Sequence, residues 1–272
     1  MHTVWKGSIS FGLVNIPVKM FTATEDKDIH FRQIHKPCGT PIRYKKVCPH
    51  CDAEVDESEI VKGYEYETGK YVIVSKEELE AIAPKTRKTI EIIDFVDLNQ
   101  IDPIYFDKTY FLSPNETGDK PYQLLRDAMK KTDKIAIAKV MIRSKETLAA
   151  IRVYENCIVM ETIFSPDEVR SVEHAPGLPN DIEVSESEMN MAVQLIENLA
   201  TDFQPEKYTD EYRERLQELI QAKVKGEDIV TAPDLPQAAN VVDLMDALKA
   251  SVEATKKAKT KRKTRKQKSA NE

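Results

Sequence analysis

Four possible metal ligands lie close together near the N-terminus of the chain. The stretch HKPCGTPIRYKKVCPHC, residues 35–51, contains His35, Cys38, Cys48 and Cys51, with two residues inside each pair and nine between the pairs. Two ligands at this spacing can bind one ion from a single tight turn, and nine residues allow a short strand pair to bring both turns together. The pattern predicts a structural zinc ribbon with tetrahedral coordination by three thiolates and one imidazole.

Other roles remain open for these residues. Cys48 and Cys51 could form a redox-active pair, and the clustered cysteines could also be ordinary buried thiols. His30 could replace His35 as the fourth ligand. A catalytic metal keeps one coordination position for water, whereas four protein ligands close the site. The pattern therefore favours a structural Zn²⁺ ion that crosslinks the two turns, and it indicates no organic cofactor.

The remainder of the sequence contains no catalytic motif. It has only 8 glycines, and it lacks a Gly-rich phosphate loop, a His-Glu-x-x-His pair and a nucleophile elbow. We assign no catalytic residue. The sequence is therefore interpreted as that of a binding protein and not of an enzyme.

Charge is distributed unevenly along the chain. Residues 1–50 carry a net charge of +5, residues 51–248 carry −19 and residues 249–272 carry +8, although the whole chain has a net charge of only −6. Inside the acidic part, residues 120–145 reverse the sign, with 8 basic and 2 acidic residues. Basic islands on an acidic chain indicate that the protein binds a polyanion at particular surfaces. The alternative for each island is that its side chains form an ordinary solvated face.

A nucleic acid would be bound mainly through its phosphates, so basic side chains in the three islands are the candidate contacts. We expect the DNA-binding residues to include Arg43, Lys45, Lys46, Lys130, Lys131, Lys134, Lys139, Arg143, Lys261, Arg262 and Lys263.

The elements that must position these residues are mostly strands in the first two thirds of the chain. Period-two patterns and β-branched residues predict strands, and two short helices interrupt them, one beginning at Ser75 and one covering residues 122–132. Many short strands with inserted helices predict a mixed α+β fold dominated by a barrel. The predicted strands lie within residues 4–21, 42–47, 70–75, 88–96, 103–112, 134–142, 148–154 and 157–164.

After residue 165 the pattern becomes helical. A capping box at Ser185 and Glu188 begins one helix, a second ends at Gly226, and a third follows Asn240. The tail over residues 256–272 is cationic and too poor in apolar residues to fold alone. The third helix either docks a partner or folds back onto the body, and its predicted partner-docking face consists of Val241, Leu244, Met245 and Leu248.

These patterns predict three regions in the 272-residue chain. Residues 1–184 form a barrel core that includes a bridging segment and the zinc turn at 35–51. Residues 185–230 form a helical arm. Residues 231–272 contain a linker, an amphipathic docking helix at 240–253 and the basic tail at 256–272.

Five segments, in order along nearly the whole chain, resemble the bacterial Ku proteins of non-homologous end joining. They are WKGSISFGLVNIPVKMF, VKGYEYETGKYVIVS, YQLLRDAMKKTDKIAIAKVMIRSKETLAAI, EYRERLQELIQAKVKG and VVDLMDALKAS. The resemblance implies a Ku-core barrel with a bridging arm, and a homodimer that closes a ring around double-stranded DNA loaded from a broken end. It also implies a C-terminal region that recruits and stimulates an ATP-dependent DNA ligase D type enzyme, and no active site of its own.

Two other functions remain open from the residues. One is a zinc-ribbon regulator that reads DNA sequence, and the other is a metal-dependent nuclease or another repair enzyme. The sequence has no apolar run near the ~18 residues of a membrane span and no visible export signal. We therefore expect a cytoplasmic, nucleoid-associated protein with no membrane partner.

Overall fold

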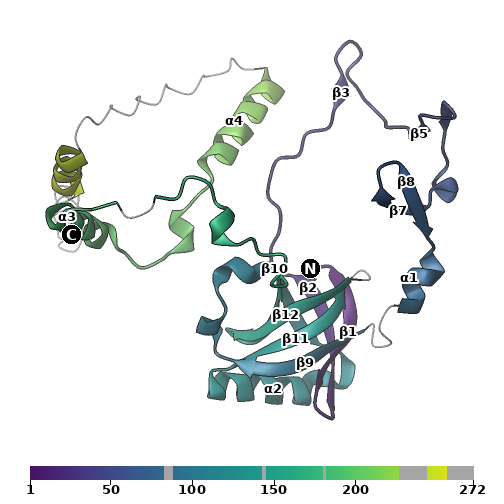
Figure 1. The fold of residues 1–272 in the computed structure, drawn as a ribbon, viewed down its shortest axis with the longest axis horizontal. Coiled ribbons are helices and arrows are strands. Elements are labelled where there is room, and N and C mark those ends of the chain that lie inside the picture. Colours follow the sequence, from purple (N-terminus) through teal and green to yellow (C-terminus); the bar gives the residue numbers. More distant parts are fainter. Residues whose placement is uncertain (83–87, 143–144, 180–181, 227–243, 256–272) are drawn as a thin grey trace. The chain divides into compact units, whose positions relative to one another are not determined.

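A computed structural model describes residues 1–82, 88–142, 145–179, 182–226 and 244–255 (Figure 1). The chain divides into one unit that spans Met1–His174 and a second that spans Ala175–Glu272. The division lies before the boundary expected at residue 184, because the last barrel strand ends at Ile163 and only the loop directly after it stays with the first unit.

The first unit contains a closed seven-stranded barrel with the strand order β1-β2-β10-β13-β12-β11-β9. Neighbouring strands are antiparallel except for β1 and β9, whose short parallel ladder closes the barrel. This barrel, followed by C-terminal helices, confirms the predicted mixed α+β fold. The strands are β1 (Thr3–Phe11), β2 (Val14–Thr22), β9 (Thr89–Val96), β10 (Phe106–Pro114), β11 (Ile135–Ile142), β12 (Lys145–Tyr154) and β13 (Cys157–Ile163).

Alternation of side chains along each strand builds the core of the barrel. On β2, Ile16, Val18 and Met20 point inward and are no more than 1% exposed, whereas the residues between them point outward. The same alternation places Ile9 of β1 and Leu112 of β10 inside. Strand pairing therefore fixes which side chains form the outer surface of the barrel.

Close backbone approach at Gly7 allows β1 and β9 to meet. Ser8 N donates to the carbonyl oxygen of Lys88 at 3.0 Å. A Cβ atom at Gly7 would lie 2.2 Å from that same oxygen and 2.2 Å from the Trp5 ring. Only glycine fits at this position.

Helix α2 (Asp119–Thr132) buries Tyr122, Leu125 and Met129 in the barrel core. The Tyr122 hydroxyl donates to the Leu112 carbonyl at 2.6 Å and accepts from the Ile158 N–H at 2.8 Å. Leu112 and Ile158 are register partners on β10 and β13, so the phenol bridges the two strands. Burial raises the pKa of Tyr122, which keeps the hydroxyl protonated and able to donate.

An extension over residues 23–88 leaves the barrel after β2 and returns immediately before β9. Its described residues, 23–82 and 88, contain three two-stranded sheets, a short 3-10 helix and α1, and the side chains of these residues are almost all exposed. The Ser75–Glu78 capping pair predicted from the sequence is present, since the Glu78 N–H donates to Ser75 Oγ at 3.1 Å. The elements are β3 (Ile34–His35), β4 (Thr40–Pro41), β5 (Val47–Cys48), β6 (Ala53–Glu54), η1 (Glu57–Glu59), β7 (Lys62–Glu67), β8 (Lys70–Val74) and α1 (Lys76–Ile82).

One strand prediction in the extension is wrong. Residues 42–46 form a connector without a strand partner, and only Val47 of the predicted strand belongs to β5. The residues on either side belong to two separate hairpins, β3–β4 and β5–β6. The connector makes only single backbone hydrogen bonds at its ends, from Ile42 N to the Gln33 carbonyl at 3.1 Å and from Val55 N to the Lys46 carbonyl at 2.9 Å.

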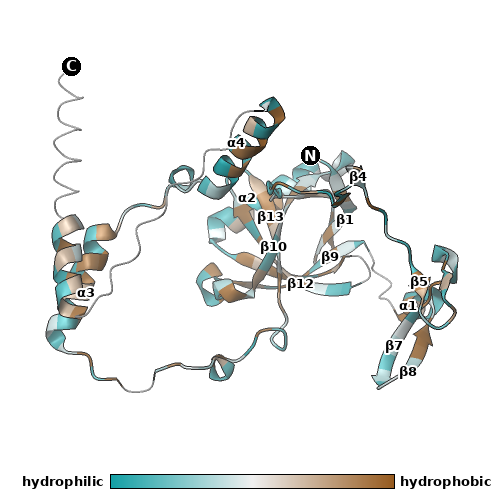
Figure 2. Ribbon diagram, turned by 90° about the horizontal axis from the view of Figure 1, so that it is seen from above, coloured by the Kyte–Doolittle hydropathy of each residue, from teal (hydrophilic) through white to brown (hydrophobic). Residues whose placement is uncertain are grey.

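The second unit consists of helices. Helix α3 (Glu186–Leu199) begins with the predicted capping box of Ser185 and Glu188, and α4 (Glu211–Lys225) ends at Gly226 with a φ of 75°. A further helix covers residues 244–255 and lies beside α3 in Figures 1 and 2. Its Val252 side chain is only 6% exposed.

Candidate nucleic-acid interface

The predicted metal ligands occupy two preformed turns. His35 and Cys38 lie in the β3–β4 turn, where His35 Nδ1 and Cys38 Sγ are 3.1 Å apart. Cys48 and Cys51 lie in the β5–β6 turn, which is closed by a hydrogen bond from Asp52 N to the Cys48 carbonyl at 2.9 Å. Within the described part of the chain, no three of these side chains come together as a metal-binding group. The structure thus forms each pair but does not join the pairs.

Thiol acidity differs between these cysteines. A hydrogen bond from Thr40 lowers the pKa of Cys38, and a hydrogen bond from the backbone of Cys51 lowers the pKa of Cys48. The neighbouring Cys48 raises the pKa of Cys51. Two of the three clustered thiols therefore lose their protons more easily than an ordinary cysteine, and the thiolate is the form that binds a metal.

The basic connector between these turns carries only one cation without an acidic partner among the described residues. Lys45 pairs with Glu54 at 2.7 Å and Lys46 pairs with Glu57 at 3.2 Å, whereas Arg43 is exposed and has no such pair. All five side chains are exposed, so a phosphate could displace either carboxylate at little cost.

The basic island predicted at residues 120–145 does not form one surface. Lys130 and Lys131 end α2, and Lys134 precedes β11 and pairs with Asp97 at 2.6 Å. β11 ends at Ile142, at the same end of the barrel as the points where the extension leaves and returns. Lys130, Lys131 and Lys134 precede β11 and therefore lie at the opposite end of the barrel. Lys139, in the middle of β11, pairs with Glu146 at 3.4 Å. The other predicted cations, Arg143, Lys261, Arg262 and Lys263, lie outside the described residues.

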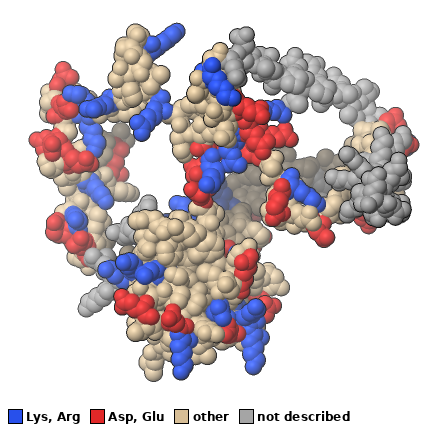
Figure 3. Space-filling model, turned by 180° about the vertical axis from the view of Figure 1, so that it is seen from behind, with Lys and Arg blue, Asp and Glu red and all other residues tan. Residues whose placement is uncertain are grey.

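Outward charges on β12 and β13 are neutralised within the barrel. Arg152 makes two hydrogen bonds to Glu161, at 3.0 and 2.6 Å, and the guanidinium lies 5.7 Å from the centre of the Tyr154 ring. The hydrogen bonds to Glu161 raise the pKa of Arg152. Figure 3 shows basic and acidic side chains intermixed over one face of the molecule.

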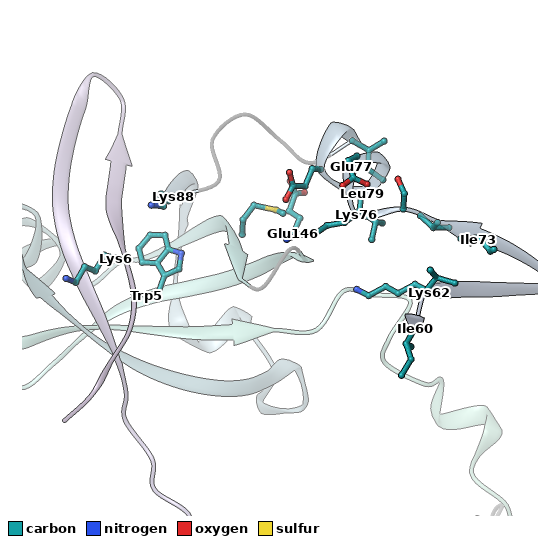
Figure 4. Close-up of a pocket in the computed structure, with 16 residues that line it drawn as sticks. Trp5, Lys6, Ile60, Lys62, Ile73, Lys76, Glu77, Leu79, Lys88 and Glu146 are labelled. Atoms are coloured by element: carbon teal, nitrogen blue, oxygen red, sulfur yellow. The ribbon is translucent and has the colours of Figure 1, made fainter. Parts of the chain in front are cut away.

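Two lysines in the first hairpin are not among the DNA-binding residues predicted from the sequence. Lys6 of β1 and Lys19 of β2 are direct register partners, and both point away from the barrel core. Figure 4 places Lys6 and Lys88 near Trp5 at the edge of a cavity whose lining also includes Glu146. The period-two pattern of both strands was a usable signal, because it puts both lysines on the outer face.

The predicted docking face of the last helix is partly covered. Leu244 is 61% exposed, while Met245 and Leu248 are half-buried. Val241 lies outside the described residues. Among the described helices, none is both long and apolar enough to cross a membrane.

Two exposed apolar surfaces stand outside the barrel. The hairpin of β7 and β8 exposes Tyr64, Tyr71 and Ile73 by 62% or more. Helix α3 carries hydrophobic residues, coloured brown in Figure 2. Four of them have exposed fractions between 44% and 67%: Met189, Val193, Ile196 and Leu199.

Known proteins similar to this chain share nearly its whole length. A family model described as the Ku70/Ku80 beta-barrel domain matches residues 10–191. A protein of Heliobacterium modesticaldum named "Non-homologous end joining protein Ku" is 52% identical over 256 residues, covering 94% of this chain and 93% of the relative. Proteins of the same name from Bacillus subtilis and Desulfitobacterium hafniense are 50% and 51% identical, each over 94% of this chain, and over 83% and 88% of their own lengths. The chain belongs to the Ku family.

Proposed function

We propose that the protein binds the ends of double-stranded DNA, independently of sequence, as a homodimeric ring in repair of double-strand breaks by non-homologous end joining. The observation that carries this proposal is a closed barrel whose extension over residues 23–88 leaves and returns at one end, in a chain of the Ku family. The relatives named above carry end joining in their names.

A ring suits phosphate contacts. An enclosed duplex presents its sugar-phosphate backbone to the wall whatever its sequence, and base edges are reached only by side chains inserted into a groove. The connector between the two cysteine-bearing turns offers Arg43, Lys45 and Lys46 in an exposed segment that belongs to no strand. Such residues provide salt-dependent affinity without base readout, which disfavours the alternative of a sequence-reading zinc-ribbon regulator.

A second copy of the chain would cover the apolar surfaces that this copy leaves exposed. A two-stranded hairpin is marginally stable alone in water, and both faces of the β7–β8 hairpin are exposed in the single chain. The exposed side of α3 offers a further apolar surface. Homodimerisation would bury this area, and it would join two extensions into one ring.

Zinc would join the two turns at residues 35–51. His35, Cys38, Cys48 and Cys51 form the thiolate and imidazole set that a structural zinc site uses, already arranged as two pairs. When bound, the metal supplies a crosslink and no reaction. The four residues would fix the connector at 42–46 in position to face a phosphate backbone.

Metal analysis of the purified protein tests this assignment. We expect about one zinc ion per chain, retained by the wild type and lost in Cys48→Ser. Replacement of the isolated Cys157 by serine is the matched control and should keep the metal. If the purified wild-type protein contains no zinc, the proposed zinc crosslink is wrong, whereas the proposed role of the basic connector is unaffected.

The C-terminal helix is proposed to recruit an ATP-dependent DNA ligase D type enzyme. Its Leu244 is exposed, and the helix is followed by the cationic segment 256–272. Deletion of residues 240–272 is expected to spare DNA-end binding and to lower ligase stimulation. Undiminished stimulation would place the docking surface on the core.

A competition assay tests the main proposal. Labelled linear duplex is bound by the protein and challenged with unlabelled linear fragment or with covalently closed circles of the same sequence. Linear fragment should compete strongly and closed circle weakly, because a closed ring needs an end to load. Equal competition would contradict the ring, a preference for one sequence would favour the regulator, and strand cleavage with added metal would favour a nuclease.

A further inference from the structure

The helix over residues 244–255 is covered along its apolar side. Met245, Leu248, Val252 and Thr255 recur at intervals of three and four residues, so they lie on one side of the helix. All four are half-buried or buried, and Val252 is only 6% exposed. The remaining exposed residues of this helix, apart from Leu244, are charged or small: Asp246, Lys249, Ala250, Ser251, Glu253 and Ala254.

Helix α3 is covered along one side in the same way. Its half-buried residues are Glu188, Met191, Ala192, Leu195 and Asn198, and helical spacing places all five on one side. Helix 244–255 lies beside α3 in both ribbon views (Figures 1 and 2). Two covered sides on neighbouring helices indicate that the helices pack against each other through these sides.

The covered side of α3 contains a polar atom without a partner. Asn198 Nδ2 is buried and has no hydrogen-bond partner within the part of the chain that the structure describes. A buried donor without an acceptor destabilises the state that buries it, and contact with water removes this cost. Separation of the two helices would let water reach the amide, so this donor favours a packing that can open.

The packing conflicts with the partner-docking face that the sequence predicts. Met245 and Leu248 of that face are half-buried, and Leu244 is the only large apolar side chain that residues 244–255 expose. An amphipathic helix binds a groove through its whole apolar side. A partner therefore cannot use this side while the side is packed on α3.

We propose that α3 is a docking surface for helix 244–255 of the same chain, and that the ligase partner binds the helix only after it leaves α3. The inference rests on the proposed recruitment of the ligase by this helix, and it adds the step that controls recruitment. α3 and the ligase compete for one apolar side. The apparent dissociation constant for the ligase then equals the intrinsic constant divided by the fraction of chains with a free helix.

Substitutions on α3 test this competition without changing the docking helix. Ala192→Glu places a carboxylate on the covered side and should release helix 244–255. Gln194→Glu adds the same charge at an exposed position of α3 and is the matched control. Asn198→Leu removes the unsatisfied donor and should strengthen the packing.

Hydrogen–deuterium exchange of the full-length protein measures the packing. A free helix of this length is marginally stable in water, so its amides exchange quickly once it leaves α3. The amides of residues 248–255 should exchange faster than in wild type in Ala192→Glu, more slowly in Asn198→Leu and equally in Gln194→Glu. Misfolding could imitate release but not slower exchange, so Asn198→Leu guards against that explanation. Equal exchange in all four proteins would overturn the packing.

Ligase binding measures the competition. The probe is a purified ATP-dependent DNA ligase D type enzyme from the organism that makes this protein. If about a tenth of wild-type chains have a free helix, Ala192→Glu should bind it roughly tenfold more tightly. Asn198→Leu should bind it more weakly, and Gln194→Glu should match wild type. Equal affinity in variants that differ in exchange would overturn the competition.

Deletion of residues 240–272 separates this inference from the proposed recruitment. Loss of ligase binding in the deletion variant supports recruitment by the helix, whatever the α3 variants do. If the deletion leaves ligase binding unchanged, the proposed recruitment and the competition are both wrong. The exchange result then still decides whether the helix packs on α3.

Discussion

Two parts of the outer surface of the barrel differ in whether their basic side chains have acidic partners. On β11, β12 and β13, outward cations are matched within the sheet, as in Arg152 with Glu161 and Lys139 with Glu146. On β1 and β2, Lys6 faces Lys19, and neither lysine forms an ion pair among the described residues. The first part stabilises the fold, whereas the second leaves its charges available to an external anion. The position of unmatched charge is therefore more informative here than the number of basic residues.

The largest effect should follow from a change in β1 where it meets β9. Gly7→Ala puts a Cβ atom 2.2 Å from the Lys88 carbonyl oxygen and from the Trp5 ring, so the closing ladder must shift, at a cost of roughly 3 kcal/mol or more in the free energy of unfolding. Urea denaturation measures this loss. Gly63→Ala is the control, because its nearest neighbour lies 3.5 Å away, and equal stability of the two variants would refute the tight closure.

An intermediate effect is expected on β12 and β13, where the outward charges are matched. Glu161→Gln leaves the Arg152 charge without its counterion at a site where the two side chains are 26% and 11% exposed. Because water still reaches this pair, we expect a loss of about 2 kcal/mol in the free energy of unfolding. Glu146→Gln, which removes the exposed partner of Lys139, should cost about 0.5 kcal/mol or less. A similar loss in both variants would show that burial does not distinguish the two pairs.

The smallest effect concerns pH. The hydrogen bond from Lys145 lowers the pKa of Glu168, and both groups are exposed. A lowered carboxyl pKa stabilises the fold above the ordinary pKa of glutamate, and the stabilisation is lost as the pH falls through the folded value. The melting temperature of wild type should therefore fall slightly more than that of Glu168→Gln between about pH 6 and pH 3. Parallel melting curves would remove this pair from the pH dependence.

The sequence predicted most elements of the fold, whereas its predicted DNA-binding residues stay a prediction. Local signals were sufficient for the barrel strands, for the capping pair of Ser185 and Glu188 and for the helix end at Gly226. The strand predicted at residues 42–47 is wrong for residues 42–46, because the strands on either side, β4 and β5, pair within their own hairpins and not with this segment. β-branched residues indicate a strand only where another strand is free to pair.

The candidate site was harder for a different reason. Counting charges along the chain drew attention to residues 120–145, where lysines are dense, yet helix α2 and β11 separate them and Asp97 and Glu146 neutralise two. Lys6 and Lys19 are sparse in sequence and become neighbours only through hairpin register. Register and cross-strand pairing are properties of the folded sheet, so the density of charge along the chain does not reveal them.

The Tyr122 hydroxyl that bridges β10 and β13 couples the helix to the sheet. Since this phenol occupies a rung between Leu112 and Ile158, α2 cannot detach without opening the ladder at that point. Backbone amides of α2 should then exchange with solvent deuterium only through the same global opening that exposes β10 and β13. A surface helix would thus share the protection of the innermost strands, and the barrel and its helix would melt as one cooperative unit.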